Sequence, residues 1–302
     1  MLQAEQPDAR ALVDALLGPS PHYKRQEVAA VLARREETTP YLLAILEAVL
    51  ADPPGYLAQL GSDFDPLYVV ALLAHLREPS AHELLLRLCR LPELQFEDLL
   101  GDFITEGMDR ALFATCDGRT EGLRALAADT AAYIYLRSQA MYALAMAVHQ
   151  GWAEREEVLA FLASLLVPEA AEAESSFWAN VCAAMLSLHP VPYAEALLRA
   201  WDDGLIDPFV MSRRHIEEQL AKGPAAAAAE LAQDVGRALT PDVHDWMGGW
   251  ACFRQETYRP IPSGRRLVTS PDPQALRAAR AAKKKARKRE RSAKKKQRKK
   301  KK

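Results

Sequence analysis

The densest chemical feature of this sequence is a run of cationic side chains near its C-terminus. From Arg277 to Lys302 there are 17 Lys and Arg residues and a single acid, Glu290, which gives the segment a net charge of +16. Such a polycation neutralises the phosphates of nucleic acid and releases condensed counterions, so it binds without reading sequence. The sequence therefore predicts contact with RNA, the ribosome or DNA. The candidate contact residues are Lys283, Lys284, Lys285, Arg287, Lys288, Arg289, Arg291, Lys294, Lys295, Lys296 and Arg298.

Other roles for this basic segment stay open. The residues before Arg277 carry a net charge of −17, so the segment could dock on the chain's own acidic part, for solubility or autoinhibition. It could also have no selected role. It contains no aromatic residue on which bases could stack, so any nucleic-acid contact through it has low sequence specificity.

Three carboxylates share one helix face if the surrounding segment is a continuous helix. Asp102, Glu106 and Asp109 are spaced i, i+4 and i+7. They could bind a cation or a basic partner peptide, including the basic segment of this chain. The alternative is a favourable placement of acids near a helix N-terminus. No base or nucleophile can be assigned beside them, so a general acid/base pair is not expected.

Three aromatic residues near the C-terminal end of the apolar sequence have the same spacing. Trp246, Trp250 and Phe253 would form one face of a short helix. They could stack bases beside the arginines that follow, or cover the exposed end of a helical stack, which we expect. The neighbouring arginines are Arg254, Arg259, Arg265 and Arg266.

No metal, cofactor or catalytic site is expected. His75 and His82 lie seven residues apart, and no third ligand can be identified near them. Phosphate-binding glycine loops and common hydrolase motifs are absent from the sequence. The cysteines lack paired spacing, which predicts buried free thiols. They are Cys89, Cys116, Cys182 and Cys252.

The first residues and the apolar segments predict a cytoplasmic protein. The N-terminal sequence lacks the basic flank and apolar run of a signal peptide. No apolar stretch approaches the roughly 20 residues that span a bilayer, so no membrane contact is expected. The sequence identifies neither the protein partner nor the oligomeric state.

Helical periodicity dominates the first 240 residues and predicts an all-α fold. Residues 42–50 and 158–166 repeat apolar side chains at i, i+3, i+4, i+7 and i+8. Residues 67–76 and 140–149 are apolar on nearly every side, which predicts helices packed between neighbours. Four pairs are expected helix starts, and they are Ser20-Pro21, Thr39-Pro40, Asp65-Pro66 and Asp207-Pro208.

Helix-breaking residues recur at intervals of 33 or 39 residues, which suits a two-helix repeat. We expect a HEAT-like α-solenoid over residues 1–240, an aromatic cap over 241–262, and a linker with a disordered Lys/Arg-rich tail over 263–302. The breaks are Pro40, Pro79, Gly118, Gly151, Pro190 and Gly223.

The helical part also resembles a bacterial family of uncharacterised proteins, domain-of-unknown-function family 1186. The resemblance covers about residues 20–222, and its most specific elements are GDFITE (101–106) and GLIDPF (204–209). It implies HEAT-like helical repeats in an intracellular bacterial protein, and it supplies no catalytic residue. Some relatives end in a cysteine-rich zinc-binding tail, whereas this chain ends in lysines. From repeats and charge together, we predict a non-enzymatic interaction scaffold. The segments that carry the resemblance are 34–47, 64–78, 101–118, 137–166 and 201–212.

Overall fold

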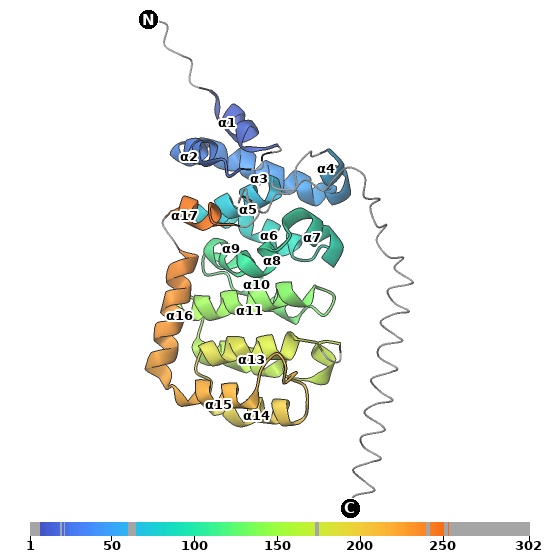
Figure 1. Cartoon of the computed structure of the whole chain (residues 1–302), viewed down its shortest axis with the longest axis vertical. Coiled ribbons are helices and arrows are strands. Elements are labelled where there is room, and N and C mark those ends of the chain that lie inside the picture. The colour runs from blue at the N-terminus through green and yellow to red at the C-terminus, as the bar shows by residue number, and fades with distance from the viewer. Residues whose placement is uncertain are drawn as a thin grey trace, which may run out of the picture. The chain divides into compact units, whose positions relative to one another are not determined.

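Helices make up all the regular secondary structure in the described part of the chain (Figure 1). The computed structural model describes residues 7–18, 20, 22–59, 65–172, 175–239, 242–250 and 253, and no β-strand occurs among them. The all-α prediction is therefore confirmed. The first helices are α1 (Ala9–Leu16), α2 (Arg25–Ala33), α3 (Arg35–Ala51), α4 (Pro53–Gln59), α5 (Asp65–His75), α6 (His82–Leu88), α7 (Glu93–Leu100), α8 (Phe103–Glu106) and α9 (Met108–Cys116).

The second half continues in the same way. Three short 3₁₀ turns, η1 (Pro79–Ala81), η2 (Pro168–Ala170) and η3 (Val191–Tyr193), each begin at or next to a proline. The helices are α10 (Glu121–Ala128), α11 (Ile134–His149), α12 (Arg155–Ser164), α13 (Phe177–Ser187), α14 (Ala194–Asp202), α15 (Arg213–Ala221), α16 (Pro224–Ala238) and α17 (Val243–Met247).

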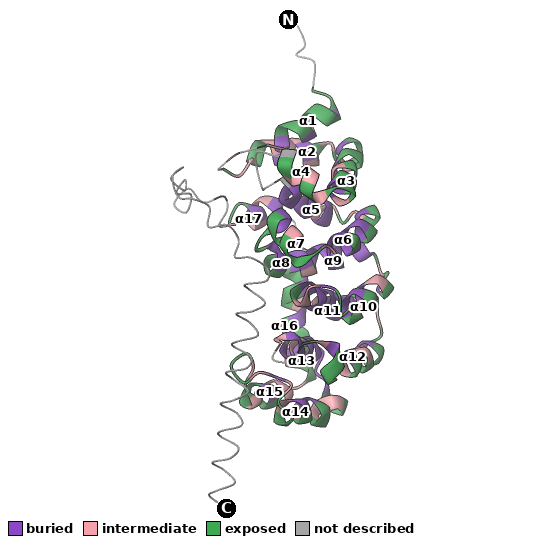
Figure 2. Cartoon of the chain, turned by 90° about the vertical axis from the view of Figure 1, so that its right-hand side faces the viewer, coloured by how far each residue is buried: buried purple, intermediate pink, exposed green. Residues whose placement is uncertain are grey.

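The helices are arranged in successive layers. Helices α3, α5, α9, α11 and α13 each pack on the next, and α6, α10 and α12 form a second column beside them (Figure 2). Helix α10 contacts both α6 and α11, and α12 contacts both α11 and α13. Each pair therefore buries its apolar side chains on the following layer. The regular HEAT-like repeat, and the domain boundaries at residues 240 and 262, stay predictions.

The helices predicted to lie between neighbours do so. In α5, all residues from Val69 to Leu73 are fully buried, and in α11 all residues from Ala140 to Ala147 except Tyr142 are buried. Helix α11 contacts α9 and α10 on one side and α12 and α13 on the other, so each side of it meets apolar side chains. This arrangement explains why its sequence has no polar stripe.

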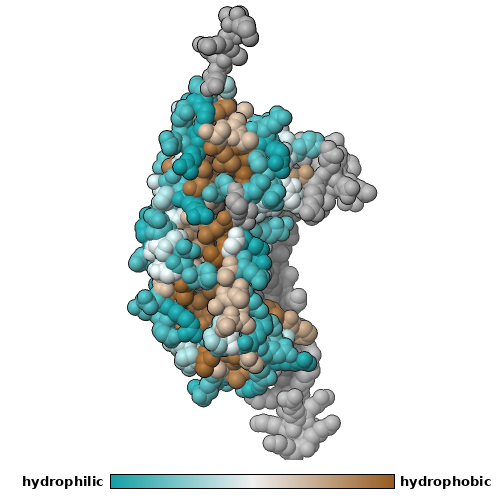
Figure 3. All heavy atoms as spheres, turned by 90° about the vertical axis from the view of Figure 1, so that its left-hand side faces the viewer, coloured by the Kyte–Doolittle hydropathy of each residue, from teal (hydrophilic) through white to brown (hydrophobic). Residues whose placement is uncertain are grey.

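After α15 the chain turns back along the layers it has just built. Helix α16 contacts α13, α11 and α9, and α17 contacts α5 (Figure 1). We call α16, α17 and Phe253 the return segment. Figure 3 views the face on which α16 lies, where hydrophobic residues form a band between hydrophilic flanks.

Of the four predicted helix starts, one is right and two are wrong, and Ser20-Pro21 includes a residue, Pro21, that lies outside the described residues. Helix α5 begins at Asp65, as expected. Helix α3 instead begins at Arg35, so Pro40 lies inside it. Asp207 accepts a hydrogen bond from the Phe209 N–H (2.9 Å) in a turn, and the next helix, α15, begins only after Ser212.

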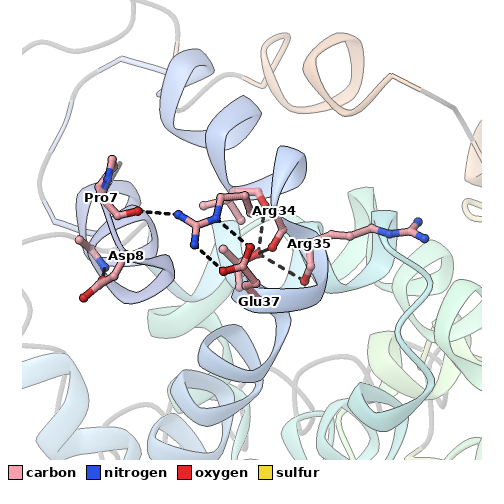
Figure 4. A network of polar contacts seen from close by, with 8 residues as sticks. Pro7, Asp8, Arg34, Arg35 and Glu37 are labelled. Carbon is pink, nitrogen blue, oxygen red and sulfur yellow. Dashed lines mark hydrogen bonds and ion pairs between the residues drawn. The ribbon is translucent and has the colours of Figure 1, made fainter. Parts of the chain in front are cut away.

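Arg34 explains the early start of α3. Its guanidinium donates to both carboxylate oxygens of Glu37, in the first turn, and to the carbonyl of Pro7 (Figure 4). The side-chain hydroxyl of Thr38 donates to the Val31 carbonyl at 2.9 Å. These contacts fix the first turn of α3 before Pro40 is reached. The helix therefore continues through Pro40, although the proline has no N–H to donate to the preceding turn.

Most predicted breaks and the buried thiols are confirmed. Gly118, Gly151 and Gly223 adopt positive φ angles of 80°, 76° and 84° between helices, a conformation that favours glycine. Pro79 and Pro190 also lie between helices, so only Pro40 was wrong. Three free cysteines are buried, and the fourth lies outside the described residues; the buried ones are Cys89, Cys116 and Cys182.

Among the residues that the structure describes, no helix is both long enough and apolar enough to cross a bilayer. The cytoplasmic location stays a prediction.

The central layer predicts a sharp difference between two leucine substitutions. Leu144 in α11 is fully buried, so Leu144→Ala should lower the free energy of unfolding by about 2–5 kcal/mol, because it leaves a cavity between packed helices. Leu94 in α7 is 72% exposed, so Leu94→Ala should change it by no more than about 0.5 kcal/mol. Urea denaturation of both variants measures this, and equal effects would contradict the layered core.

Candidate functional site

A cleft of about 690 Å³ lies where the return segment meets the layered helices. Helices α8, α9, α11, α13, α16 and α17 all contribute to its lining, so it joins residues more than 130 positions apart in sequence. Its lining residues are Glu106, Asp109, Arg110, Tyr142, Ala145, Met146, Ala183, Ser187, Leu231, Asp234, Arg237, Ala238, Asp245 and Trp246. We refer to this feature as the cleft.

Two of the three predicted carboxylates line the cleft, although the continuous helix that suggested them does not exist. Helix α8 ends at Glu106, Gly107 intervenes, and α9 begins at Met108. A Cβ atom at Gly107 would lie 2.4 Å from the Phe103 ring, so this close approach requires glycine. Glu106 and Asp109 both face the cleft, whereas Asp102 is exposed before α8 and does not line it.

Arg110 is the most unusual residue of the lining. It is only 7% exposed, and its guanidinium carbon lies 3.4 Å from the centre of the Trp246 ring. Its Nε–H is enclosed and has no hydrogen-bond partner, and no ion pair joins its guanidinium to a described carboxylate. Burial lowers the pKa of Arg110 to about 10, against the opposing charge of Asp109.

Arg137 is a second buried arginine that lies on an aromatic ring. Arg137 is 1% exposed and its guanidinium carbon lies 3.8 Å from the Phe177 ring centre. It donates to the carbonyls of Ala127 (2.9 Å) and Ala170 (2.7 Å), and so joins α10, α11 and η2. Arg137 Nη2 is enclosed without a hydrogen-bond partner, as Arg110 Nε is. The difference is that Arg110 lacks the two bonds to carbonyls that hold Arg137.

The carboxylate of Asp109 shares this partly dry environment. Burial is the main cause that raises the pKa of Asp109; the backbone N–H groups of Arg110 and Asp109 oppose it, and the charge of Asp234 adds to it. Burial and the charge of Asp109 together raise the pKa of Tyr142 to about 12. The Tyr142 hydroxyl donates to Asn180 Oδ1 at 3.3 Å, which holds the phenol in place. The lining thus contains charges of both signs, some of them partly buried.

The prediction that three aromatic residues cover the exposed end of the helical stack was wrong. They are Trp246, Trp250 and Phe253. Trp250 packs at 5.7 Å from the Phe103 ring, and Phe253 packs at 5.3 Å from Tyr68 in α5. Helices α14 and α15 form the last layer of the stack, and this layer lies away from α5 and α8 (Figure 1). The aromatic residues instead anchor the return segment on the side of α5 and α8. The arginines after Phe253 lie outside the described residues.

A polar contact reinforces this aromatic anchor. The Tyr23 hydroxyl lies 2.7 Å from His244 Nδ1, and the Tyr23 ring packs 5.4 Å from Phe253. Burial raises the pKa of Tyr23 to about 12, so the phenol is neutral and can donate. The return segment is therefore attached to the first helices of the chain.

The two histidines considered as metal ligands are separate. His82 is buried, and its Nδ1 lies 3.2 Å from the Thr115 hydroxyl. Burial also lowers the pKa of His75, helped by the charge of Arg110. In the described ranges no group of three or more His, Cys, Asp or Glu side chains is arranged to hold a metal ion.

Comparison with known proteins places the helices and the cleft in one family. The family model "Protein of unknown function (DUF1186)" matches residues 10–254. The chain belongs to this family. The DUF1186 match is longer than the resemblance expected from sequence, because it also contains the return segment and so the complete lining of the cleft. The basic segment from Arg277 lies beyond the matched residues.

Two curated relatives are similar to this DUF1186 chain. An uncharacterized protein of Chlamydia trachomatis (serovar D) is 26% identical over 193 residues, which cover 64% of this chain and 76% of the relative. An uncharacterized protein of Chlamydia muridarum is 25% identical over 193 residues, covering 64% and 77%. No solved structure matches this chain significantly.

Sequence patterns did not reveal Arg110, Tyr142 or Trp246 as parts of one site. A single arginine within the apolar run of α9 was the available indication, because a charge there must find a partner or a ligand. The carboxylates Asp234 and Asp245 come from the return segment, whose path no local pattern predicts.

The neutral, buried state of His82 predicts a loss of stability in acid. Burial lowers its pKa from 6.5 to about 4, so between these values the unfolded chain binds a proton that the folded chain does not. The free energy of unfolding should therefore fall as pH drops through this range, by up to about 1.4 kcal/mol per pH unit. Denaturation at several pH values measures this.

Two variants isolate the contribution of His82. His82→Gln should flatten the dependence between pH 6.5 and 4. His215→Gln, on the exposed surface of α15, should leave it unchanged. The same steep fall in both variants would assign the acid sensitivity to other groups.

Proposed function

We propose that this chain is a non-enzymatic interaction protein. Its layered helices bind a protein partner through the carboxylate surface around the cleft, and its basic segment attaches to nucleic acid or a ribonucleoprotein. The observation that carries the proposal is the separation of charge between a body of −17 and a segment of +16.

The carboxylates around the cleft support contact with a basic partner. Asp102 and Glu106 are exposed on either end of α8, and Asp245 is exposed on α17. Exposed charges of one sign steer an oppositely charged partner and speed its association more than they add affinity. A basic peptide or protein surface is therefore the partner class that this surface fits.

The basic segment supports attachment to polyanions. Its eleven candidate residues, from Lys283 to Arg298, lie outside the described residues and beyond the family match. Attachment through these residues would add a binding function to the family module, and that function would depend on charge alone.

A second candidate is favoured by the same charges. The basic segment could occupy the carboxylate surface of its own chain, as an autoinhibitory or solubilising element. Nucleic acid would then have to displace it.

An enzyme acting in the cleft is the third candidate. The raised pKa of Asp109 is a property that a general acid uses. Two hydroxyl groups line the cleft, and neither donates to a base: Ser187 donates to the Ala184 carbonyl at 2.8 Å and Tyr142 to Asn180 Oδ1 at 3.3 Å. We therefore rank binding before catalysis.

Removing the basic segment tests the nucleic-acid part of the proposal. Full-length chain should bind fluorescently labelled single-stranded RNA, with log K falling by about 0.7 per phosphate contact for each tenfold rise in salt. A variant ending at Gln274 keeps the whole family match and should lose this binding while its circular dichroism stays helical. Equal RNA binding by both proteins would remove the role of the segment.

Small-angle scattering separates the second candidate from the first. A segment docked on the carboxylate surface should release as salt is raised, because the Debye length falls to about 10 Å at 0.1 M. The radius of gyration of the full-length chain should then increase with salt, whereas that of the variant ending at Gln274 should not. A radius independent of salt would contradict docking.

A further inference from the structure

The guanidinium of Arg110 is buried at the cleft and has an N–H group without a partner. Arginine carries five N–H donors in one plane, and Trp246 covers a face of that plane without accepting from any of them. Arg110 is more than nine-tenths buried and faces the cleft. Its Nε–H is enclosed without a hydrogen-bond partner, and a planar guanidinium in a cleft suits a carboxylate or phosphate.

The chain's own carboxylates do not fill this role. Asp234 pairs with Arg237 across one turn of α16. Asp109 directs its carboxylate to backbone N–H groups at the start of α9, and no ion pair links it to Arg110 in the described chain. The described carboxylates therefore leave the guanidinium of Arg110 without an ion pair.

The remaining charges of the lining exclude a strongly anionic ligand. Four carboxylates and two arginines face the cleft, so a dianion such as phosphate would be repelled by the surplus. The same surplus attracts a cationic group. Glu106 and Asp245 are exposed at the opening, and Asp109 lies deeper. A ligand that carries one carboxylate and one cation satisfies both halves of the lining.

The size and apolar surface of the cleft further limit the ligands that it can hold. Its volume of about 690 Å³ is that of small-molecule sites, typically about 300–1,000 Å³. Met146 and Leu231 provide apolar contact, and the rings of Tyr142 and Trp246 provide aromatic contact.

We propose that the cleft binds a small zwitterion of the amino-acid class, with its carboxylate on Arg110 and its cationic group among Glu106, Asp109 and Asp245. The apolar lining favours an apolar or aromatic ligand side chain. This site goes beyond the proposed function, because it takes a small molecule inside the cleft. It shares Glu106 and Asp245 with the proposed partner surface, whereas Arg110 and Asp109 belong to the cleft alone.

Thermal denaturation of the full-length chain with each of the twenty free L-amino acids tests the proposal. At least one amino acid with an apolar or aromatic side chain should raise the melting temperature, with an increase that grows with concentration. Isothermal titration then gives its Kd. The methyl ester of that amino acid lacks the carboxylate and its N-acetyl form lacks the cation, so each should bind about tenfold or more weakly.

Substitution of Arg110 locates the site. Arg110→Lys keeps the positive charge but loses the planar donors, and should weaken binding about tenfold or more. Arg124→Lys is the matched control, because Arg124 stacks on Phe161 at 5.4 Å outside the cleft, and it should bind like the unchanged chain. If Arg110→Lys unfolds the chain, Asp245→Asn at the exposed opening replaces it and should also weaken binding.

Three results would overturn this proposal. The first is that none of the twenty amino acids changes the melting temperature. The second is that the ligand does not need both charges. This would follow if the ester and the N-acetyl form bind as tightly as the parent amino acid, or if inorganic phosphate or succinate binds instead of an amino acid. The third is that the Arg110 or Asp245 variant binds with unchanged Kd. None of these results depends on the RNA or the protein partner.

Discussion

The burial of α11 on both of its sides is the constraint on which the rest of the structure depends. A helix that is apolar all round gains stability only if neighbours cover it completely, and α9, α10, α12, α13 and α16 together do so. This requirement determines the order of the layers on either side of it. It also determines where α16 can lie, because α16 covers what the first column of helices leaves open.

The cleft is a by-product of this coverage. Helix α16 crosses several layers, so it cannot follow the surface of each one closely, and space remains between it and α9, α11 and α13. Arg110 lies in that space on the aromatic support of Trp246, whereas Arg137 lies between tightly packed elements and reaches carbonyl acceptors. The same residue type thus donates to backbone carbonyls in one place and forms no such bond to the described chain in the other.

Local patterns predicted those features of the fold that local forces determine. The helical class, the buried α5 and α11, and the glycine breaks follow from periodicity and backbone preference within short windows. The start of α3 was missed because Arg34 forms contacts with Glu37 and Pro7 that outweigh the capping preference of Thr39-Pro40. The carboxylates Glu106 and Asp109 were found for a partly wrong reason, since Gly107 divides the helix assumed between them. The path of α16 and α17, and with it the partnership of Arg110 with Trp246, depends on contacts between distant segments that no window of sequence contains.

The attachment of His244 to Tyr23 also has a kinetic meaning. These two residues are 221 positions apart, whereas successive layers join neighbours in sequence. Stacked helix pairs can form one after another as the chain emerges from the ribosome, because each needs only the pair before it. The return segment raises the contact order of the domain and closes it late. The lining of the cleft is therefore complete only when the last described helix has been synthesised, so a ribosome-bound chain lacks the cleft until the family module has been translated.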